Sequence, residues 1–400
     1  MPARIDSYVA QTTGLLQFSG GGTQYVVQTT TGVLYLIYVD TGSDLIFKKS
    51  TDGGMTWSSG TAIFAGTIVA LSVWYDRWSG IAAGKIHLAY TESGGSDVLY
   101  RSIDTESSDA LATQTTIFNG TSSAAGGALS LTRTRGGNLL CRGCIDAGAE
   151  PFFIRSTDVG ANWGSRNTTG LTAIATQDQY LMMPGFAADN QDALCIFWDA
   201  SANAILRQVY DDSANTWSEA SLASSMQDSL ASGSFPHFAG AVDLTNSKIV
   251  LIAWNVVDFF NADLQCWTVD ESAATAKTDV VTNSTDDQGL AAIGIDTDTG
   301  FWYAFYVGKS DGSETVGTAV NVYSKISKDS GSTWGSETLI SNSARNVKWL
   351  CCTPRFVRPY AVAMHYDEAS TIPEIRVSAL VAAPHGIPGF LHSIEGGISA

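Results

Sequence analysis

The chain has 400 residues, of which 44% are hydrophobic and 15% charged, and its formal net charge is -17 at pH 7. This apolar content is enough to bury a large core, which argues against disorder, and the negative charge would repel nucleic acid and anionic membranes. The longest apolar runs fall far short of the ~20 residues that a membrane helix needs, and the opening MPARIDSYVAQTTG lacks the basic start and apolar stretch of a secretory signal peptide.

Strands are predicted throughout the chain, in groups of four. The first group reads TQYVVQT, VLYLIYV, DLIFKKS and TAIFAG, with the alternation and β-branched content typical of strands. Equivalent middle pairs follow: KIHLAY with DVLYRS, NLLCRGC with PFFIRS, ALCIFW with AILRQVY, KIVLIAW with ADLQCW, FWYAFYV with AVNVYS, and YAVAMHY with EIRVSAL. A unit that recurs in this way predicts one repeat architecture instead of several unrelated domains.

A short motif follows the third strand of most groups. STDGGMTW at residues 50–57 and SKDSGSTW at residues 327–334 match the pattern S-x-D-x-G-x-T-W, and STDVGANW and YDDSANTW are close variants. SIDTESS and TVDESAA are weaker relatives. The aligned aspartates fall at steps of 52, 54, 54, 58 and 59 residues: Asp52, Asp104, Asp158, Asp212, Asp270 and Asp329.

This pattern resembles the Asp-box, or BNR, repeat of sialidases and related β-propellers, over nearly the whole chain. The Asp can accept hydrogen bonds from turn amides, the hydroxyls can brace the hairpin, and the Gly permits a positive φ. The tryptophans of the motif can fill the seam between neighbouring blades: Trp57, Trp163, Trp217 and Trp334. We therefore expect a structural and not a catalytic role for the aspartates and tryptophans of the motif.

The predicted fold is a single all-β propeller of four-stranded antiparallel blades, with seven blades favoured and six as the alternative. The last pair, YAVAMHY with EIRVSAL, has no motif and no outer strand after it. The N-terminal segment, about residues 7–18, is free to complete that blade and to close the ring. Residues 1–381 then form the propeller, and residues 382–400 form a Pro/Gly-rich tail that is expected to contact another subunit.

A sialidase site is not expected, although the repeat resembles that family. Such a site needs three arginines around a carboxylate, with a Tyr–Glu pair and an acid. Most of the 13 arginines fall at the ends of first strands or in third strands, and only Arg345 belongs to a connection between blades. The connections between blades also offer acidic candidates for ligand binding: Asp178, Asp228 with His237 close by, Asp286 and Asp287. These side chains are also typical of solvated turns.

Cysteine chemistry and cofactors are not indicated. Cys141 and Cys144 form a CxxC, but residues three apart on a strand face opposite sides, and no second pair completes a zinc site. Free buried thiols are the expectation, with no disulfide framework, no metal and no cofactor.

Three functions remain open. The favoured hypothesis is a non-enzymatic structural or recognition propeller, such as a virion component of a phage tail, fibre or decoration, with protein subunits as partners through the tail and a surface glycan as a further partner. The second hypothesis is a propeller that binds or hydrolyses glycans with paired carboxylates. The third is an intracellular assembly scaffold. Fold alone does not separate them.

Overall fold

The computed structural model describes most of the strands and turns of the chain and leaves several connections undescribed. The described residues are 4–11, 25–75, 84–93, 97–119, 129–145, 150–171, 180–199, 204–224, 226, 238–258, 261–284, 290–311, 313–314, 320–345, 347–357, 360–367 and 374–381. They contain no helix that is long and apolar enough to cross a membrane. The tail at residues 382–400 lies outside them.

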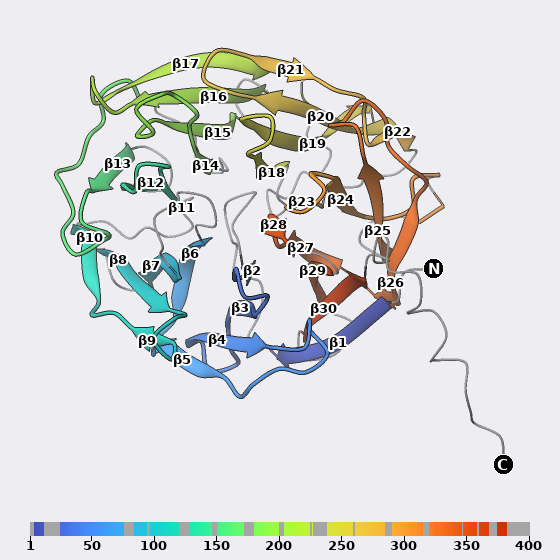
Figure 1. Cartoon of the computed structure of the whole chain (residues 1–400), viewed down its shortest axis with the longest axis horizontal. Coiled ribbons are helices and arrows are strands. Elements are labelled where there is room, and N and C mark those ends of the chain that lie inside the picture. Colours follow the sequence, from blue (N-terminus) through green and yellow to red (C-terminus); the bar gives the residue numbers. More distant parts are fainter. Residues whose placement is uncertain are drawn as a thin grey trace.

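The strands of the described residues form seven sheets, and each sheet is one blade of a ring (Figure 1). Blade 1 contains β2 (Val26–Gln28), β3 (Leu34–Val39), β4 (Leu45–Ser50) and β5 (Thr61–Phe64). Blade 2 contains β6 (Ile68–Tyr75), β7 (Lys85–Glu92), β8 (Asp97–Asp104) and β10 (Thr115–Asn119), with the short β9 (Ala110–Leu111) beside β8. Blade 3 contains β11 (Leu129–Arg133), β12 (Leu139–Ile145) and β13 (Glu150–Ser156).

The remaining blades continue the same pattern around the ring. Blade 4 contains β14 (Tyr180–Pro184), β15 (Ala193–Asp199), β16 (Ala204–Asp211) and β17 (Thr216–Ala223). Blade 5 contains β18 (Phe238–Asp243), β19 (Lys248–Asp258), β20 (Asn261–Val269), β21 (Ala274–Ala276) and β22 (Val281–Ser284). Blade 6 contains β23 (Ala291–Asp296), β24 (Trp302–Val307), β25 (Val320–Ser327) and β26 (Thr338–Arg345), and β28 (Arg355–Phe356) pairs in parallel with β23.

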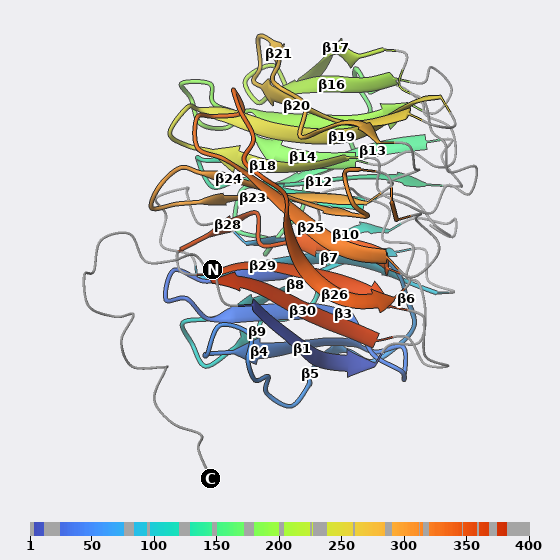
Figure 2. The ribbon, with the colours of Figure 1, turned by 90° about the vertical axis from the view of Figure 1, so that its right-hand side faces the viewer.

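Blade 7 joins the two ends of the propeller. It contains β27 (Val347–Cys352), β29 (Tyr360–Asp367) and β30 (Glu374–Val381), and its outer strand is β1 (Arg4–Gln11). β1 pairs antiparallel with β30 from Arg4 opposite Leu380 to Gln11 opposite Glu374 (Figure 2). The predicted propeller of antiparallel blades, closed by an N-terminal strand, is confirmed. The strand begins three residues earlier than predicted, and residues 12–18 lie outside the described residues.

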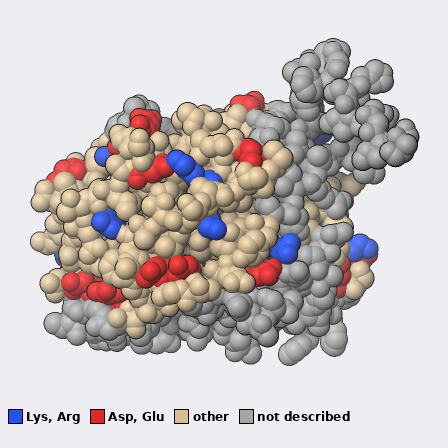
Figure 3. All heavy atoms as spheres, turned by 90° about the horizontal axis from the view of Figure 1, so that it is seen from below, with Lys and Arg blue, Asp and Glu red and all other residues tan. Residues whose placement is uncertain are grey.

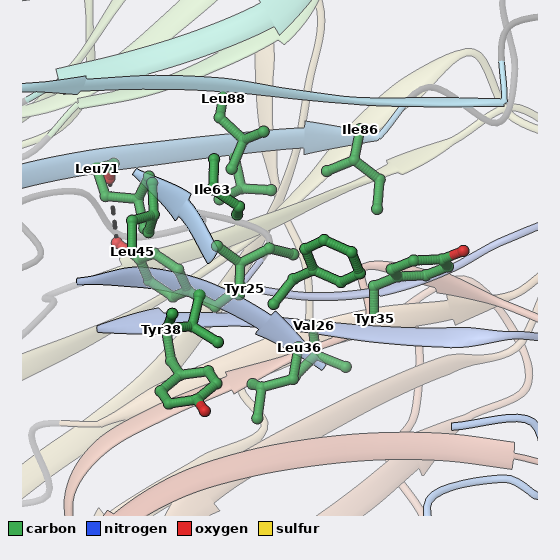
Figure 4. Close-up of a cluster of buried hydrophobic side chains, with 14 of the residues drawn as sticks. Tyr25, Val26, Tyr35, Leu36, Tyr38, Leu45, Ile63, Leu71, Ile86 and Leu88 are labelled. Carbon is green, nitrogen blue, oxygen red and sulfur yellow. Dashed lines mark hydrogen bonds between the residues drawn. The ribbon is translucent and has the colours of Figure 1, made fainter. Parts of the chain in front are cut away.

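Each blade is covered on both faces by its neighbours, so the core lies in the seams between blades. All six residues of β3 are buried, because one face of this strand packs on blade 2 and the other on blade 7. Figure 4 shows the seam of blades 1 and 2, where Tyr25 lies on the side of Ile86 and Leu88, while Leu36 points to the opposite side of its blade. The Tyr25 hydroxyl donates to the Leu71 carbonyl across this seam at 3.2 Å. Burial on both faces explains why the strands read as nearly continuous apolar runs.

The inner strands form a ring of their own around the axis. β6 contacts β11, β11 contacts β14, and the series continues through β18, β23, β27 and β2. Buried serines join two of these pairs: Ser72 Oγ accepts the Leu131 amide and Ser130 Oγ accepts the Met182 amide, both at 2.9 Å. The inner strands of successive blades therefore begin on the same face of the ring.

Five of the six cysteines have described side chains, and each of them is a free, buried thiol. Burial raises the pKa of Cys266 and Cys351 to about 12, so both thiols stay protonated at neutral pH. The side chain of Cys144 lies outside the described residues. The thiols therefore act as small apolar core groups.

Candidate functional site

The ring has two different faces. The first carries the turns between first and second strands together with the segments that match S-x-D-x-G-x-T-W, which we call box turns. Their common location follows from direct contacts: Asn246 in a first turn of blade 5 donates to Ser330 in the box turn of blade 6 at 3.2 Å, and the Ala187 amide in blade 4 donates to Glu271 of the fifth box turn at 3.0 Å. We call this the box face. The connections between blades enter the inner strands on the opposite face.

Three box turns share one hydrogen-bond pattern. In the turn at residues 50–57, the Asp52 carboxylate accepts the Thr56 amide at 2.9 Å and the Ser50 hydroxyl at 2.7 Å, while the Gly54 amide donates to Ser50 Oγ at 2.8 Å. The turns at residues 156–163 and 327–334 repeat it through Asp158 and Asp329. Hydrogen bonds from Thr56 and Ser50 lower the pKa of Asp52 to about 2. These carboxylates are ionised and already engaged by the turn.

In the other box turns an aspartate also accepts hydrogen bonds, but the groups that donate to it differ. Asp104 and Asp270 each accept hydrogen bonds from two amides of the following turn. In the turn at residues 210–217, Asp212 forms an ion pair with Arg155 of blade 3, and the preceding Asp211 accepts the Ala214 amide at 3.0 Å. In the fourth turn, Asp211 therefore accepts the turn amide, while the aligned Asp212 contacts the neighbouring blade.

The box turns hold each blade to the one before it. The Thr115 hydroxyl of blade 2 donates to the Gly160 carbonyl of the third turn at 2.9 Å. Arg207 of blade 4 donates to the Asp270 carbonyl of the fifth turn at 2.7 Å. The motif tryptophans pack in the same seams: Trp57, Trp163 and Trp334 are half-buried, and Trp217 is buried. These residues therefore have a structural role, which is to join neighbouring blades.

The acidic candidates of the sequence belong to connections between blades that precede inner strands in the chain. Asp178, Asp228, His237, Asp286 and Asp287 lie outside the described residues, and Arg345 is the last residue of β26, with its side chain undescribed. The strands that follow these positions are described: Tyr180 begins β14, Phe238 begins β18 and Val347 begins β27. These inner strands, with β23, belong to four consecutive blades. In the chain, the candidates therefore precede the inner strands of four neighbouring blades.

Blade 6 holds two tyrosine–carboxylate pairs that the sequence did not reveal. Tyr306 donates to Glu337 and Tyr323 donates to Glu314, each at 2.7 Å, and the two rings stack with centroids 6.4 Å apart. Burial is the largest cause of a raised pKa in both tyrosines, and the carboxylates add to it. A tyrosine that holds its proton this firmly is a poor base or nucleophile. The Ser310 amide of the second-to-third loop donates to Glu337, and Glu314 of the same loop accepts the Asn321 amide of β25, so the pairs anchor that loop.

A histidine and a tyrosine meet in the seam of blades 2 and 3. His87 Nδ1 lies 2.7 Å from the Tyr100 hydroxyl, which also lies 3.2 Å from the Val159 carbonyl of the third box turn. The hydroxyl has one proton and the carbonyl can only accept, so Nδ1 of His87 carries the proton that it shares with Tyr100. Burial, with smaller contributions from Arg133 and Lys85, lowers the pKa of His87 to about 3. This side chain is neutral and completely buried, which fits a seam contact.

Arg142 is a charged residue of the core that the sequence patterns did not predict. It lies in the middle of β12, in NLLCRGC, and is completely buried between blades 3 and 4. Its guanidinium carbon lies 4.6 Å from the ring centre of Tyr180, 5.3 Å from that of Phe197 and 5.4 Å from that of Trp217. A charged residue inside an otherwise apolar strand pattern was the only signal for it. Among the described residues, no group of three His, Cys, Asp or Glu side chains could hold a metal ion.

The fold defines a β-propeller, and comparisons with known proteins agree on the fold. No family model and no curated protein sequence matches the chain. It is similar to a polysaccharide lyase of family PL25, an ulvan lyase, with a TM-score of 0.59 and 10% identity over 95% of this chain and 96% of that one. The ulvan lyase bound to -[GlcA(1-4)Rha3S]- gives 0.58 and 9%.

Two other solved structures also match the chain. AofleA from Arthrobotrys oligospora matches with a TM-score of 0.50 and 9% identity over 92% of each chain. Hadza microbial sialidase Hz136 matches with 0.46 and 13% over 89% of this chain and 64% of its own. Identities this low establish the fold and leave the chemistry to the residues of this chain.

Proposed function

We propose that this chain is a carbohydrate-binding propeller built from Asp-box repeats, with its ligand site on the face opposite the box turns. The observation that supports the proposal is that the inner strands of four consecutive blades are described, and that the candidates precede these strands in the chain: Asp178, Asp228, His237, Asp286, Asp287 and Arg345. We expect these carboxylates, the imidazole and the guanidinium to converge near the ring axis, where they would be suitable hydrogen-bond partners for sugar hydroxyls. The similarity of fold to an ulvan lyase supports the same ligand class.

The proposed ligand is an uncharged glycan. The chain carries 39 Asp and Glu against 22 Lys and Arg. Figure 3 shows both kinds of charge interspersed over one side of the ring, with acidic side chains following one another along one edge. Five of the six candidate residues are acidic or neutral at pH 7. A site of this composition repels uronate and sulfate groups, which distinguishes the proposed ligand from the -[GlcA(1-4)Rha3S]- bound by the ulvan lyase.

We favour binding over cleavage because the described acid–base groups are unsuited to catalysis. Tyr306 and Tyr323 have raised pKa values, and His87 is buried and neutral. The box carboxylates are engaged by their own turns. Hydrolysis by a carboxylate pair would need two of the acidic candidates roughly 5 to 10 Å apart, and it is a separate outcome of the same experiment.

The test is a glycan array that carries neutral and anionic oligosaccharides, followed by calorimetry on the best ligand. We expect neutral glycans to bind, and we expect Asp178→Asn and Asp228→Asn to weaken binding about tenfold each, since a lost hydrogen bond to a charged group is worth ~1.5 kcal/mol or more. Asp298→Asn is the matched control, because Asp298 is exposed in a turn of the box face. Binding that is lost equally in the control, or no binding to any glycan, would refute the proposal. Release of reducing ends would favour the hydrolase instead.

A role in a larger assembly, such as a virion, is a second proposal that rests on the sequence alone. Its partners would be protein subunits held by the tail at residues 382–400. It is compatible with glycan binding, because a recognition propeller can be one part of a particle.

A further inference from the structure

The seam of blades 3 and 4 contains a buried cation that is not paired with an acid in the described residues. Arg142 donates from Nη1 to the side-chain oxygen of Gln208, and Gln208 in turn donates to the exposed Glu219 at 2.7 Å. No ion pair of Arg142 occurs among the described side chains, and its Nε and Nη2 have no hydrogen-bond acceptor. A buried guanidinium is strongly disfavoured unless its charge and its donors are satisfied.

Two other buried donors in the same seam also have no hydrogen-bond acceptor among the described residues. Trp217 Nε1 is buried without an acceptor, and its ring lies against the Arg142 guanidinium. Thr132 Oγ1 is also buried without a partner. It lies on β11 two residues from Ser130, the residue paired with Arg142 in the sheet, so it shares the face of Arg142. Three side chains of one seam thus present N–H or O–H groups, and the described residues supply nothing to accept them.

Among the described residues, the groups that contact the Arg142 guanidinium directly are uncharged, and the Glu219 carboxylate is linked to it only through Gln208. The Cys195 thiol approaches the guanidinium, but burial raises the pKa of this thiol, so it is neutral. Tyr180, Phe197 and Trp217 offer ring faces, which attract a cation but accept no conventional hydrogen bond at Nε or Nη2. A water molecule would satisfy donors and would leave the charge uncompensated.

We propose that the seam of blades 3 and 4 binds a monoatomic anion of the halide class, held by Arg142 Nε and Nη2 with the Trp217 indole N–H and the Thr132 hydroxyl. Ring centres within 4.6 to 5.4 Å of the guanidinium carbon leave little room for a polyatomic anion. The anion would complete the packing of two blades and stabilise the ring without taking part in glycan binding.

The test uses the full chain with bromide as the probe. In crystals grown in sodium bromide, anomalous diffraction at the bromine edge should show a peak within hydrogen-bond distance of Arg142 Nε and Nη2. In solution, the thermal unfolding midpoint should rise saturably with sodium bromide relative to sodium gluconate at the same ionic strength. An ordered water at this place, with no bromine peak and no bromide-specific rise, would overturn the proposal.

Two variants keep the solution test decisive. Arg142→Met should abolish the bromide-specific rise, and Trp217→Phe, which keeps the ring and removes the N–H, should increase the half-saturating bromide concentration about tenfold. Arg135→Met is the matched control, because Arg135 also stacks on an aromatic ring but donates to the Gly185 and Ala187 carbonyls. It should keep the full bromide response. A response that survives in both Arg142→Met and Trp217→Phe would place the anion elsewhere and overturn the assignment.

Discussion

Replacing Gly160 with alanine should destabilise the propeller by about 2 to 5 kcal/mol. Gly160 has a φ of 85°, which costs an L-residue about 1 to 2 kcal/mol. A Cβ at this position would also lie 2.2 Å from Cε1 of Tyr100, a ring held in place by His87 and by the Val159 carbonyl. Displacing a packed ring costs a further ~1 to 3 kcal/mol.

A substitution at Gly32 distinguishes the backbone cost of a positive φ from the steric cost of displacing the Tyr100 ring. Its φ is also 85°, but a Cβ there would meet nothing within 4 Å. Gly32→Ala should therefore lose only the backbone part, about 1 to 2 kcal/mol. Urea unfolding followed by tryptophan fluorescence measures both variants, and an unchanged m-value shows that the unfolded state is the same.

The reasoning fails if Gly160→Ala and Gly32→Ala lose the same free energy of unfolding. A double-mutant cycle gives a second check. In a Tyr100→Ala background the ring is absent, so adding Gly160→Ala should cost about 1 to 2 kcal/mol, as it does at Gly32. A cost as large as in the wild-type background would show that Tyr100 is not the group that clashes.

Two further outcomes follow from titration and from the tail. The pKa of His87 is lowered from 6.5 to about 3 in the folded chain. Between these two pH values, the unfolded chain therefore binds a proton that the folded chain does not. The free energy of unfolding should fall as the pH drops from about 6.5 to about 3. His87→Gln should show a shallower fall in urea titrations across this window, and an identical slope would contradict the assigned environment of His87. For the tail, light scattering should give a larger native mass for the full chain than for a chain that ends at Val381; equal monomeric masses would remove the assembly proposal.

The sequence determined the repeat and the four-strand unit, because these depend on contacts that are short in the chain and that recur at a similar spacing. Within a box turn, Ser50, Asp52, Gly54 and Thr56 bond across two to four residues, so their identities appear directly as a motif. The N-terminal strand is predicted by elimination, since the last blade has no outer strand after it in the chain. The structure then placed it at Arg4–Gln11.

Tertiary structure alone decided which polar residues the seams bring together. Arg142 and Gln208 are 66 residues apart, and Ala187 and Glu271 are 84 apart, with no period shared between the two pairs. The fourth box turn makes the same point: Asp212 aligns with the other box aspartates, yet it pairs with Arg155 of the preceding blade while Asp211 accepts the turn amide. Contacts between blades join residues whose separation depends on loop lengths, and so they leave no periodic trace in the sequence.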